Sequence, residues 1–402
     1  MIKRDVDVLV AGSGVSGAAA AIVSARQGLR ICLIEKESFT GGIGFAGLLT
    51  NICGLYLNGD IAPTETLNKG LAQEIVALLH KLSPDRTVKK IGRVYVLPYS
   101  RDELRSVFDQ LFCAEPDLDV HLDTSVVSVN KKEEKITGIT VENSGKRYDI
   151  VPAVAIDCTG NGEVSAMAGA GFDLSLPEER QLAGYILRIK GIRDFGETLQ
   201  VKVPFYMAEA VEKKRLSPFL RFSTLSHGDD MDEGYLKISL AADDTMSKED
   251  AGSEALSVHR YLAERLEQFK DSYIAETSQA VMQREGRRIR GEYTLTEEDI
   301  LNAKKFPDGI VKNSWPIEIW DRNKGTIYKY VPKCDYYEIP FGCLKVKGFE
   351  NLLCTGRCIS VSHAALGSTR VMGTCTSLGE QAGIAAANMI KHGNYLLSGN
   401  RI

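Results

Sequence analysis

A glycine-rich turn near the N-terminus constrains the fold of this chain more than any other feature. The segment 12–17, Gly-Ser-Gly-Val-Ser-Gly, follows the apolar run 6–11 and opens an alanine-rich stretch that ends at Gly28. A short apolar run bounded by charge and glycine is typical of a buried parallel strand, and the alanine-rich stretch predicts a helix. A second apolar run over 29–35 completes a strand–helix–strand unit. We therefore expect an α/β fold with a parallel sheet.

The spacing of these glycines indicates a binding site for a dinucleotide. Gly12 permits a tight turn, Gly14 lets a pyrophosphate approach the backbone, and Gly17 lets the helix pack on the strand. Unpaired N–H groups at the helix start favour phosphate, and Glu35 at the end of the second apolar run can accept hydrogen bonds from an adenosine ribose. The alternative is a glycine-rich turn with a surface glutamate. The residues that we predict to bind the cofactor here are Gly12, Ser13, Gly14, Val15, Ser16, Gly17, Glu35 and Lys36.

Three more glycine-bearing segments indicate FAD rather than a nicotinamide cofactor. They are 41–47, 157–160 and 356–357, and the last two follow apolar runs. An extended, buried cofactor needs several close approaches of the backbone, whereas one turn covers the pyrophosphate of NAD. Each segment alone is equally well explained as an ordinary turn, so the prediction rests on their combination. The further residues that we predict to contact FAD are Gly42, Ile43, Gly44, Val127, Cys158, Thr159, Gly160, Gly356, Arg357, Thr374 and Cys375.

The middle of the chain differs from both ends. Residues 173–334 are more charged and contain shorter β-like pieces such as 235–240, whereas the pattern of an apolar strand followed by glycine returns at 351–356. We therefore predict a discontinuous FAD-binding domain of Rossmann type over 1–172 and 335–402, with a β-rich substrate or cap domain, 173–334, inserted into it. The predicted helices cover 65–82, 101–114, 247–272 and 375–391, and the other predicted strands are three segments within 119–150 and one at 153–157.

Several segments of this chain are similar to a known family. They are Asp157-Cys-Thr-Gly-Asn-Gly-Glu163, 285–300, Tyr337-Glu-Ile-Pro-Phe341 and, most specifically, 356–375, Gly-Arg-Cys-Ile-Ser-Val-Ser-His-Ala-Ala-Leu-Gly-Ser-Thr-Arg-Val-Met-Gly-Thr-Cys. With the N-terminal glycines, they resemble FAD-dependent oxidoreductases of the glutathione-reductase-like FAD fold, and especially a bacterial group related to succinate dehydrogenase and fumarate reductase flavoproteins. The resemblance runs through nearly the whole chain. One departure is Arg357, because related flavoproteins often carry an acid there to hold the ribityl chain.

The segment before the last predicted helix is expected to reach the flavin. A helix start directed at the flavin pyrimidine would stabilise negative charge there, and Thr374 and Cys375 would be the nearest backbone donors. The alternative is an ordinary C-terminal helix.

Arg370 and His363 are the candidate catalytic residues. Arg370 can hold a carboxylate with two hydrogen bonds, and the resemblance loosely implies a substrate-binding role for it. His363 can exchange a proton near neutral pH. For both residues a hydrogen bond that braces a loop is an equal alternative. For the nearby basic cluster, Arg284, Arg287, Arg288 and Arg290, we favour a solvated or salt-bridged strand.

Charge and composition exclude several classes of function. Lys+Arg is 49 and Asp+Glu is 53, so a net charge of −4 gives no electrostatic basis for binding nucleic acid. No apolar run is long enough to span a membrane, and acids near residue 5 argue against a signal peptide. The 9 cysteines lack metal-ligand spacing, so we expect reduced thiols, no metal and a cytoplasmic protein. The sequence leaves the oligomeric state open.

The function we expect is hydride transfer between a small organic substrate and flavin N5. No second strand–glycine–helix fingerprint for NAD(P)H is present, so the other electron partner would be external. Two alternatives remain. One is a flavin monooxygenase or halogenase, although the stretch Trp315-Pro-Ile-Glu-Ile-Trp320 does not reproduce the halogenase tryptophan motif. The other is a binding protein that keeps the scaffold without using flavin.

Overall fold

A mixed β-sheet forms the centre of the molecule. The computed structural model describes residues 3–241 and 246–396. Six strands of the sheet follow the order β6-β2-β1-β9-β8-β7, and a seventh, β20, also pairs with β9. The parallel strands are β1 (Lys3–Ala11), β2 (Ile31–Ile34), β6 (Leu118–His121), β9 (Lys146–Asp157) and β20 (Leu352–Cys354), and β7 (Thr124–Lys132) and β8 (Lys135–Asn143) add an antiparallel hairpin. The predicted opening strand–helix–strand unit is confirmed.

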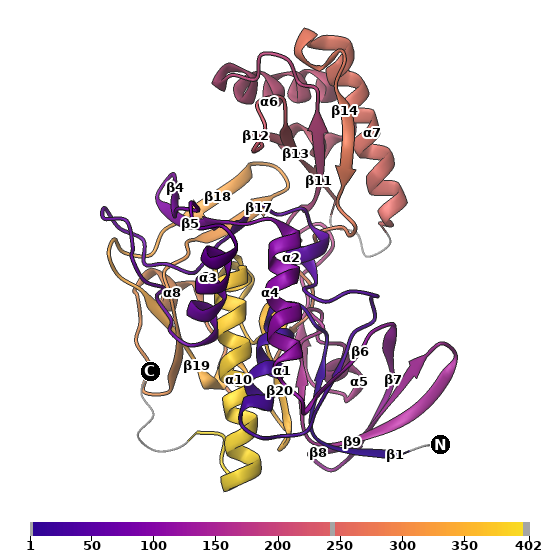
Figure 1. Cartoon of the computed structure of the whole chain (residues 1–402), viewed down its shortest axis with the longest axis vertical. Helices are drawn as coiled ribbons and strands as arrows, with labels where there is room; N and C mark the ends of the chain where they lie inside the picture. Colours follow the sequence, from indigo (N-terminus) through magenta and orange to yellow (C-terminus); the bar gives the residue numbers. More distant parts are fainter. Residues whose placement is uncertain (1–2, 242–245, 397–402) are drawn as a thin grey trace.

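Two helices far apart in the sequence pack closely on this sheet. Helix α1 (Val15–Arg26) lies beside α10 (Met372–His392), as Figure 1 shows in indigo and yellow. A Cβ atom on Gly379 would lie 2.0 Å from the Ser16 carbonyl oxygen, and one on Gly383 would lie 2.7 Å from the Ala20 carbonyl oxygen. Glycine is therefore required where α10 crosses α1, and this contact joins the last part of the chain to the first.

Strand β9 is longer than predicted. The sequence predicted β segments up to residue 150 and a separate strand at 153–157, but one strand runs from Lys146 to Asp157. Pairing with β8 reaches Ile150, and pairing with β20 begins at Ala155. Pro152 lies between these two pairings, and on the other edge of the strand it is paired in register with Val6 of β1.

Three helix boundaries also differ from the predictions. Helix α3 (Leu71–Leu82) begins at residue 71 and not 65, since Gly70 has φ 79° and the Glu380 carboxylate accepts the Leu71 N–H at 2.9 Å. Helix α7 (Lys248–Arg265) starts at a Ser247 capping box but ends before 272, where the chain turns extended. Helix α10 starts three residues early, at Met372, and ends at Gly393 as predicted.

The middle of the chain forms a lobe of its own at the top of Figure 1. Its antiparallel sheet has the order β12-β13-β11-β14, formed by Thr224–His227, Gly234–Leu240, Ala183–Lys190 and Tyr273–Thr277. Helices α6 (Glu197–Glu212) and α7 pack with this sheet around a separate apolar core.

Smaller elements connect the lobe to the main body. Buried side chains between 289 and 346 belong to the large cluster around the central sheet. The predicted domain boundaries at 172/173 and 334/335 stay a prediction. The remaining elements are α2 (Ile43–Ala46), β3 (Asn51–Ile52), β4 (Lys89–Ile91), β5 (Val94–Pro98), α4 (Arg101–Cys113), α5 (Glu163–Met167), β10 (Phe172–Asp173), β15 (Arg288–Ile289), α8 (Glu297–Leu301), β16 (Gly309–Asn313), β17 (Ile317–Asp321), β18 (Gly325–Lys329), β19 (Tyr337–Pro340), α9 (His363–Thr369) and the 3-10 helices Pro218–Phe222, Glu267–Phe269, Phe341–Cys343 and Gly356–Cys358.

Candidate functional site

The glycine-bearing segments singled out in the sequence lie against one another at the carboxyl ends of β1, β9 and β20. A Cβ atom on Gly12 would lie 2.6 Å from the Cys158 carbonyl oxygen, and one on Gly42 would lie 2.9 Å from the Gly14 Cα. Gly356, with φ 84°, faces Ser16 at the start of α1. Loop 41–44 also pairs with this turn, since the Gly41 N–H donates to the Ser13 carbonyl at 2.9 Å. Four distant segments thus form one backbone cradle.

Gly14 and Gly17 have different surroundings within this cradle. A Cβ atom on Gly17 would lie 1.8 Å from the Gly12 carbonyl oxygen, whereas one on Gly14 would meet no atom of the described residues within 4 Å. Gly17 is therefore needed for packing, and Gly14 faces open space at the N-terminus of α1. The cradle fits a pyrophosphate there, because that position offers unpaired backbone N–H groups and the positive end of the helix dipole.

Glu35 is buried at the end of β2, beside this turn. Its carboxylate accepts hydrogen bonds from the Ser13 N–H at 2.6 Å and the Ser13 hydroxyl at 2.8 Å. The Thr124 N–H donates to the Glu35 carbonyl at 2.8 Å, which places the start of β7 beside it. Val127 lies where the β7–β8 register shifts, and Lys36 is exposed. The residues predicted for the adenosine end of FAD are therefore close in space.

A buried carboxylate that the sequence reading did not assign supports the second glycine segment. One oxygen of Asp157 accepts hydrogen bonds from the Thr159 N–H at 3.1 Å and the Thr159 hydroxyl at 2.7 Å. The other accepts from the Ser165 N–H and hydroxyl, both at 2.8 Å. Asp157 fixes the turn Cys158–Gly160 rather than facing a ligand. Its place at the strand end was visible in the sequence, but its partners were not.

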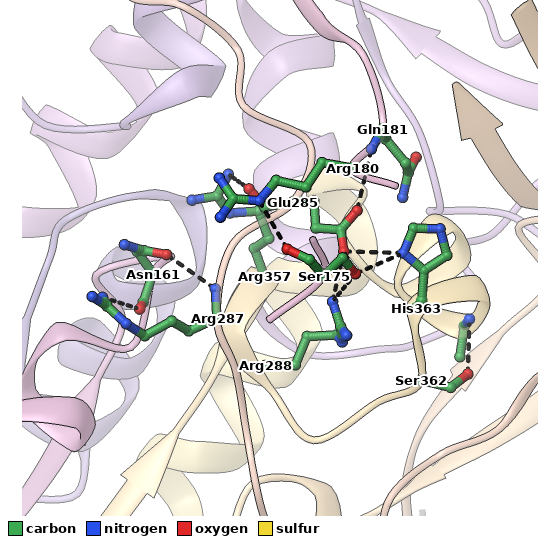
Figure 2. A network of polar contacts seen from close by, with 11 residues as sticks. Asn161, Ser175, Arg180, Gln181, Glu285, Arg287, Arg288, Arg357, Ser362 and His363 are labelled. Carbon is green, nitrogen blue, oxygen red and sulfur yellow. Dashed lines mark hydrogen bonds and ion pairs between the residues drawn. The ribbon is translucent and has the colours of Figure 1, made fainter. Parts of the chain in front are cut away.

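Arg357 bridges segments from three parts of the chain. Its Nε donates to the Gly160 carbonyl at 2.7 Å and its Nη1 donates to the Gln283 carbonyl. Figure 2 shows it near Glu285, whose carbonyl oxygen lies 3.5 Å from Nη1. Burial lowers the pKa of the Arg357 guanidinium. Since its partners here are carbonyl oxygens, Arg357 brings positive charge to the cofactor cradle.

The first turn of α10 is arranged differently from the prediction. The Cys375 N–H donates to the Val371 carbonyl at 2.9 Å, so it belongs to the helix and is not a free donor. The Gly373 N–H donates to the Cys53 carbonyl at 2.8 Å. Thr374 remains a candidate donor, because neither its N–H nor its buried hydroxyl has a partner among the described residues.

His363 belongs to a polar network on the cofactor side of the lobe interface. Its Nδ1 lies 3.0 Å from Glu285 Oε1 and 3.2 Å from the Ser175 hydroxyl, and its other ring nitrogen points away from them (Figure 2). Arg288 forms an ion pair with Glu285 at 2.7 Å. Burial would raise the pKa of Glu285, but hydrogen bonds from His363 and Ser175 lower it to about 2. The ionised carboxylate can only accept, so Nδ1 carries the proton and Nε2 is the acceptor.

Arg370 caps the other end of the short helix that begins at His363. Its Nη2 donates to the Glu318 carbonyl at 3.2 Å, and its buried Nε has no partner among the described residues. Burial lowers the pKa of Arg370, partly opposed by the Glu318 charge. The two candidate catalytic residues are thus held on one helix, roughly 10 Å apart at 1.5 Å per residue.

The basic cluster divides in two. Arg288 and Arg290 form ion pairs with Glu285 and Asp173, which matches the salt-bridged strand that we favoured. Arg284 does not: it is buried, and its Nη1 donates to the Leu182 carbonyl. The interpretation of the cluster as a solvated or salt-bridged strand is wrong for Arg284, because its guanidinium is buried against the Trp320 ring.

The described residues contain neither a candidate membrane span nor a candidate metal cluster. None of their helices is long and apolar enough to cross a membrane. No group of three or more His, Cys, Asp or Glu side chains in the same part of the chain is placed to hold a metal ion. The absence of a metal and the cytoplasmic location stay predictions.

Comparison with known proteins gives the family. The structure is similar to a geranylgeranyl bacteriochlorophyll reductase-like protein from Thermoplasma acidophilum, with 12% identity, a TM-score of 0.50, and coverage of 98% of this chain and 80% of that chain. It is also similar to p-nitrophenol 4-monooxygenase from Pseudomonas putida (11%, TM-score 0.52, 98% and 82%) and to a flavin-dependent brominase (13%, TM-score 0.51, 98% and 81%). At such identities these likenesses establish the fold alone.

The predicted fold class is confirmed: this is a Rossmann-like FAD-binding fold with β-rich insertions. No curated protein matches the sequence. A family model described as "FAD dependent oxidoreductase" matches residues 7–396. The chain belongs to this family of FAD-dependent oxidoreductases, and its cofactor is FAD.

Proposed function

We propose that this enzyme oxidises or reduces a small organic anion at the interface between the FAD cradle and the lobe. Bound FAD supplies two-electron chemistry at the flavin ring, and the protein supplies binding, orientation and charge. The loop after Gly42 contacts the lobe, because the Gln279 N–H donates to the Ala46 carbonyl at 2.7 Å and the Ser278 hydroxyl to the Gly47 carbonyl at 3.1 Å. A substrate held at this interface would meet residues of both parts.

The observation that carries the proposal is that the buried guanidinium of Arg370 has an Nε atom without a hydrogen-bond partner among the described residues. Arg370 directly precedes the first turn of α10. A buried cation without a paired carboxylate is costly, so its retention supports a ligand that supplies the negative charge. A carboxylate matches the planar donor fork of arginine and can take two parallel hydrogen bonds.

His363 is proposed to move a proton in the same reaction. Glu285 accepts from Nδ1 and holds the tautomer, which leaves Nε2 as the basic atom. With 35% of its side chain exposed, His363 can reach a ligand at the interface. Its proposed role is to take a proton from the substrate during oxidation or to supply one during reduction.

The second electron partner is proposed to be external, since the chain carries only one dinucleotide fingerprint. Oxygen acting as that partner would correspond to the monooxygenase alternative, to which hydroxylase-like structures give support at the level of fold.

Anaerobic flavin spectroscopy tests this function. The FAD-loaded protein is mixed with a library of small carboxylates and with their neutral amides, and bleaching of the visible flavin band is followed. We expect bleaching by at least one carboxylate, or reoxidation of chemically reduced enzyme by one. Admission of oxygen with product analysis then separates a dehydrogenase from a hydroxylase. A library in which only neutral compounds react would refute the anionic substrate.

A further inference from the structure

Two more cations lie near Arg370, and they come from the lobe side of the interface. Lys237 belongs to β13, and Arg284 follows the end of the lobe sheet. The Lys237 ammonium lies 3.9 Å and the Arg284 guanidinium carbon 4.0 Å from the ring centroid of buried Trp320 on β17. Gly184 makes room for Arg284, because a Cβ atom there would lie 2.9 Å from its Nη2. These two cations are held in place by packing against a rigid aromatic ring.

One carboxylate accompanies the three cations. Glu318 accepts hydrogen bonds from Trp320 Nε1 at 3.0 Å and from the Tyr328 hydroxyl at 3.4 Å. In the described part of the chain, no ion pair joins it or any other carboxylate to Lys237, Arg284 or Arg370. When all three cations are protonated, three positive charges and one negative charge leave two positive charges without compensation.

Burial and the neighbouring charges shift the pKa values of these groups. Burial, followed by the nearby Arg284 charge, lowers the pKa of Lys237 to about 7. Burial and then Arg370 lower the pKa of Arg284 to about 9. The pKa of Glu318 is lowered despite its burial, because Arg370, Lys237 and Arg284 act on it together. Crowding like charges at this place destabilises the protein unless a ligand offsets it.

The cluster lies next to the place where the flavin is expected. The charges of Lys237 and Arg370 both oppose the rise that burial causes in the pKa of Cys53. A Cβ atom on the neighbouring Gly54 would lie 2.7 Å from the Thr374 hydroxyl in the first turn of α10. Leu48, which follows the glycine-bearing segment 41–47, packs with Ile186 of β11. Ile186 lies opposite Lys237 in the pairing of β11 with β13. A ligand bound by these charged residues would therefore lie between the lobe and the segment 41–48.

We propose that Lys237, Arg284 and Arg370 form one binding site for a substrate that carries two negative charges. The inference rests on the proposed function and narrows it, because a single carboxylate would satisfy Arg370 alone. Two carboxylates and one phosphate group both supply this charge, and Glu318 limits the excess to two. Lys237 and Arg284 are binding residues in this site, and Trp320 positions them.

Anion titrations of the oxidised, FAD-loaded protein test the inference. Acetate, malonate and inorganic phosphate are each added at constant ionic strength, and the shift of the flavin absorption band gives the dissociation constant. We expect a dianion to bind at least about tenfold more tightly than acetate. Preference for malonate assigns a dicarboxylate, and preference for phosphate assigns a phosphate ester. Equal affinity for all three would overturn the inference.

Three variants separate this site from general charge effects. Lys237→Met and Arg284→Gln should each weaken dianion binding at least about tenfold, while exposed Lys324→Met on the β17–β18 turn should leave it unchanged. Glu318→Gln should strengthen dianion binding, which loss of structure would not do. FAD content and thermal unfolding are measured for each variant. Weaker binding in a folded Glu318→Gln protein, or unchanged binding in folded Lys237→Met and Arg284→Gln proteins, would contradict the site.

The two proposals can fail separately. If malonate or phosphate binds with the expected preference but no substrate bleaches the flavin, the proposed redox function is wrong and the anion site stands. If carboxylates bleach the flavin but acetate binds as tightly as the dianions, the proposed function stands and the second charge is wrong.

Discussion

The cofactor cradle and the interface between the lobe and the main body consist of different chemical groups. Backbone forms the cradle: Gly12, Gly14 and Gly42 let chain segments and ligand approach, and carbonyl and N–H groups line it. Charged side chains line the interface, where Lys237 and Arg284 pack on the Trp320 ring and Arg370 donates to the nearby Glu318 carbonyl. A cradle made of backbone can hold the same cofactor throughout a family. A wall made of side chains can change with the substrate.

This contrast predicts that substitutions in the two regions have different effects, which experiments can test. Substitutions of cradle residues that face the cofactor, such as Gly14, should remove FAD and leave the lobe folded. Substitutions at the interface should alter substrate binding and leave FAD in place. The effects below run from the largest expected to the smallest.

Gly14→Val should abolish FAD binding while the protein still folds. The new side chain would point into the space where no described atom lies within 4 Å, so it conflicts with the pyrophosphate rather than with the protein. FAD released by denaturation is measured together with circular dichroism and thermal unfolding. Gly17→Val is the matched contrast, because its side chain would collide with the Gly12 carbonyl and should impair folding as well. A full flavin complement in Gly14→Val would mean that another loop holds the phosphates.

Arg370→Lys should slow flavin reduction and leave FAD content near normal. Lysine keeps the charge but loses the planar fork, and a charge-assisted hydrogen bond of about 1.5–3 kcal/mol corresponds to roughly tenfold to a hundredfold in rate. Stopped-flow reduction by the best substrate measures it, with Arg290→Lys in the exposed Asp173 ion pair as control. Loss of both FAD and thermal stability would instead assign Arg370 a bracing role. Unchanged rates in Arg370→Lys and Arg370→Ala would leave His363 as the better candidate.

Dianion affinity should fall as the pH rises through about 7. The folded-state pKa of Lys237 is lowered to about 7, so its charge is lost near neutral pH, whereas Arg284, with a pKa of about 9, stays charged longer. Glu318, Arg370 and Cys53 also face Lys237, and Glu318 has a lowered pKa and stays ionised in this range. Malonate titrations from pH 6 to 8 at constant ionic strength check the direction. Lys237→Arg should flatten the profile, and a profile that persists in this variant would assign the titration to another group.

The same lowered pKa has a consequence for stability. The unfolded chain binds a proton at Lys237 that the folded chain has released between about pH 7 and 10, so this group should make the ligand-free protein more stable as the pH rises through that window. Dianion binding should abolish the trend by holding the proton on Lys237, because the folded and unfolded chains then carry the same proton in this window. Unfolding by denaturant at pH 7 and 9, in wild type and Lys237→Met, measures the contribution, and equal pH dependence in the two proteins would contradict it.

Thr374→Val should have the smallest effect, and it should favour the FAD-free protein while it weakens the binding of FAD. The Thr374 hydroxyl is buried without a partner among the described residues, so its removal should stabilise the FAD-free protein by about 1 kcal/mol. If the hydroxyl bonds FAD, the same change should weaken FAD binding. Chemical denaturation with and without FAD resolves the two effects. Lower stability of the FAD-free variant would show that the hydroxyl already has a partner in the protein.

The turn at 12–17 and the strands beside it were predicted well because these residues are close together in the sequence and their spacing has a direct physical meaning. Gly12, Gly14 and Gly17 belong to one turn, and the apolar runs beside them form the strands β1 and β2. Boundaries set by distant partners were missed. Leu71 begins its helix because Glu380 caps it, and no local pattern near residue 71 contains that information.

The interface could not be predicted in the same way. Arg284 is visible in the sequence as one of four neighbouring arginines, but only the fold separates it from the salt-bridged Arg288 and Arg290. Lys237 and Glu318 alternate with apolar residues, as surface residues of any strand do. Their shared contact with Trp320 depends on how the lobe sheet and the β17–β18 hairpin meet.

The central claim is that the interface recognises an anion beside the flavin. The most direct measurement is the anaerobic rate of flavin reduction, in FAD-loaded enzyme, by one reactive carboxylate and by its neutral amide. The carboxylate should reduce the flavin at least about tenfold faster at equal concentration, because the amide leaves buried cations unpaired. Equal rates for the acid and the amide, in enzyme with a full complement of FAD, would contradict the claim.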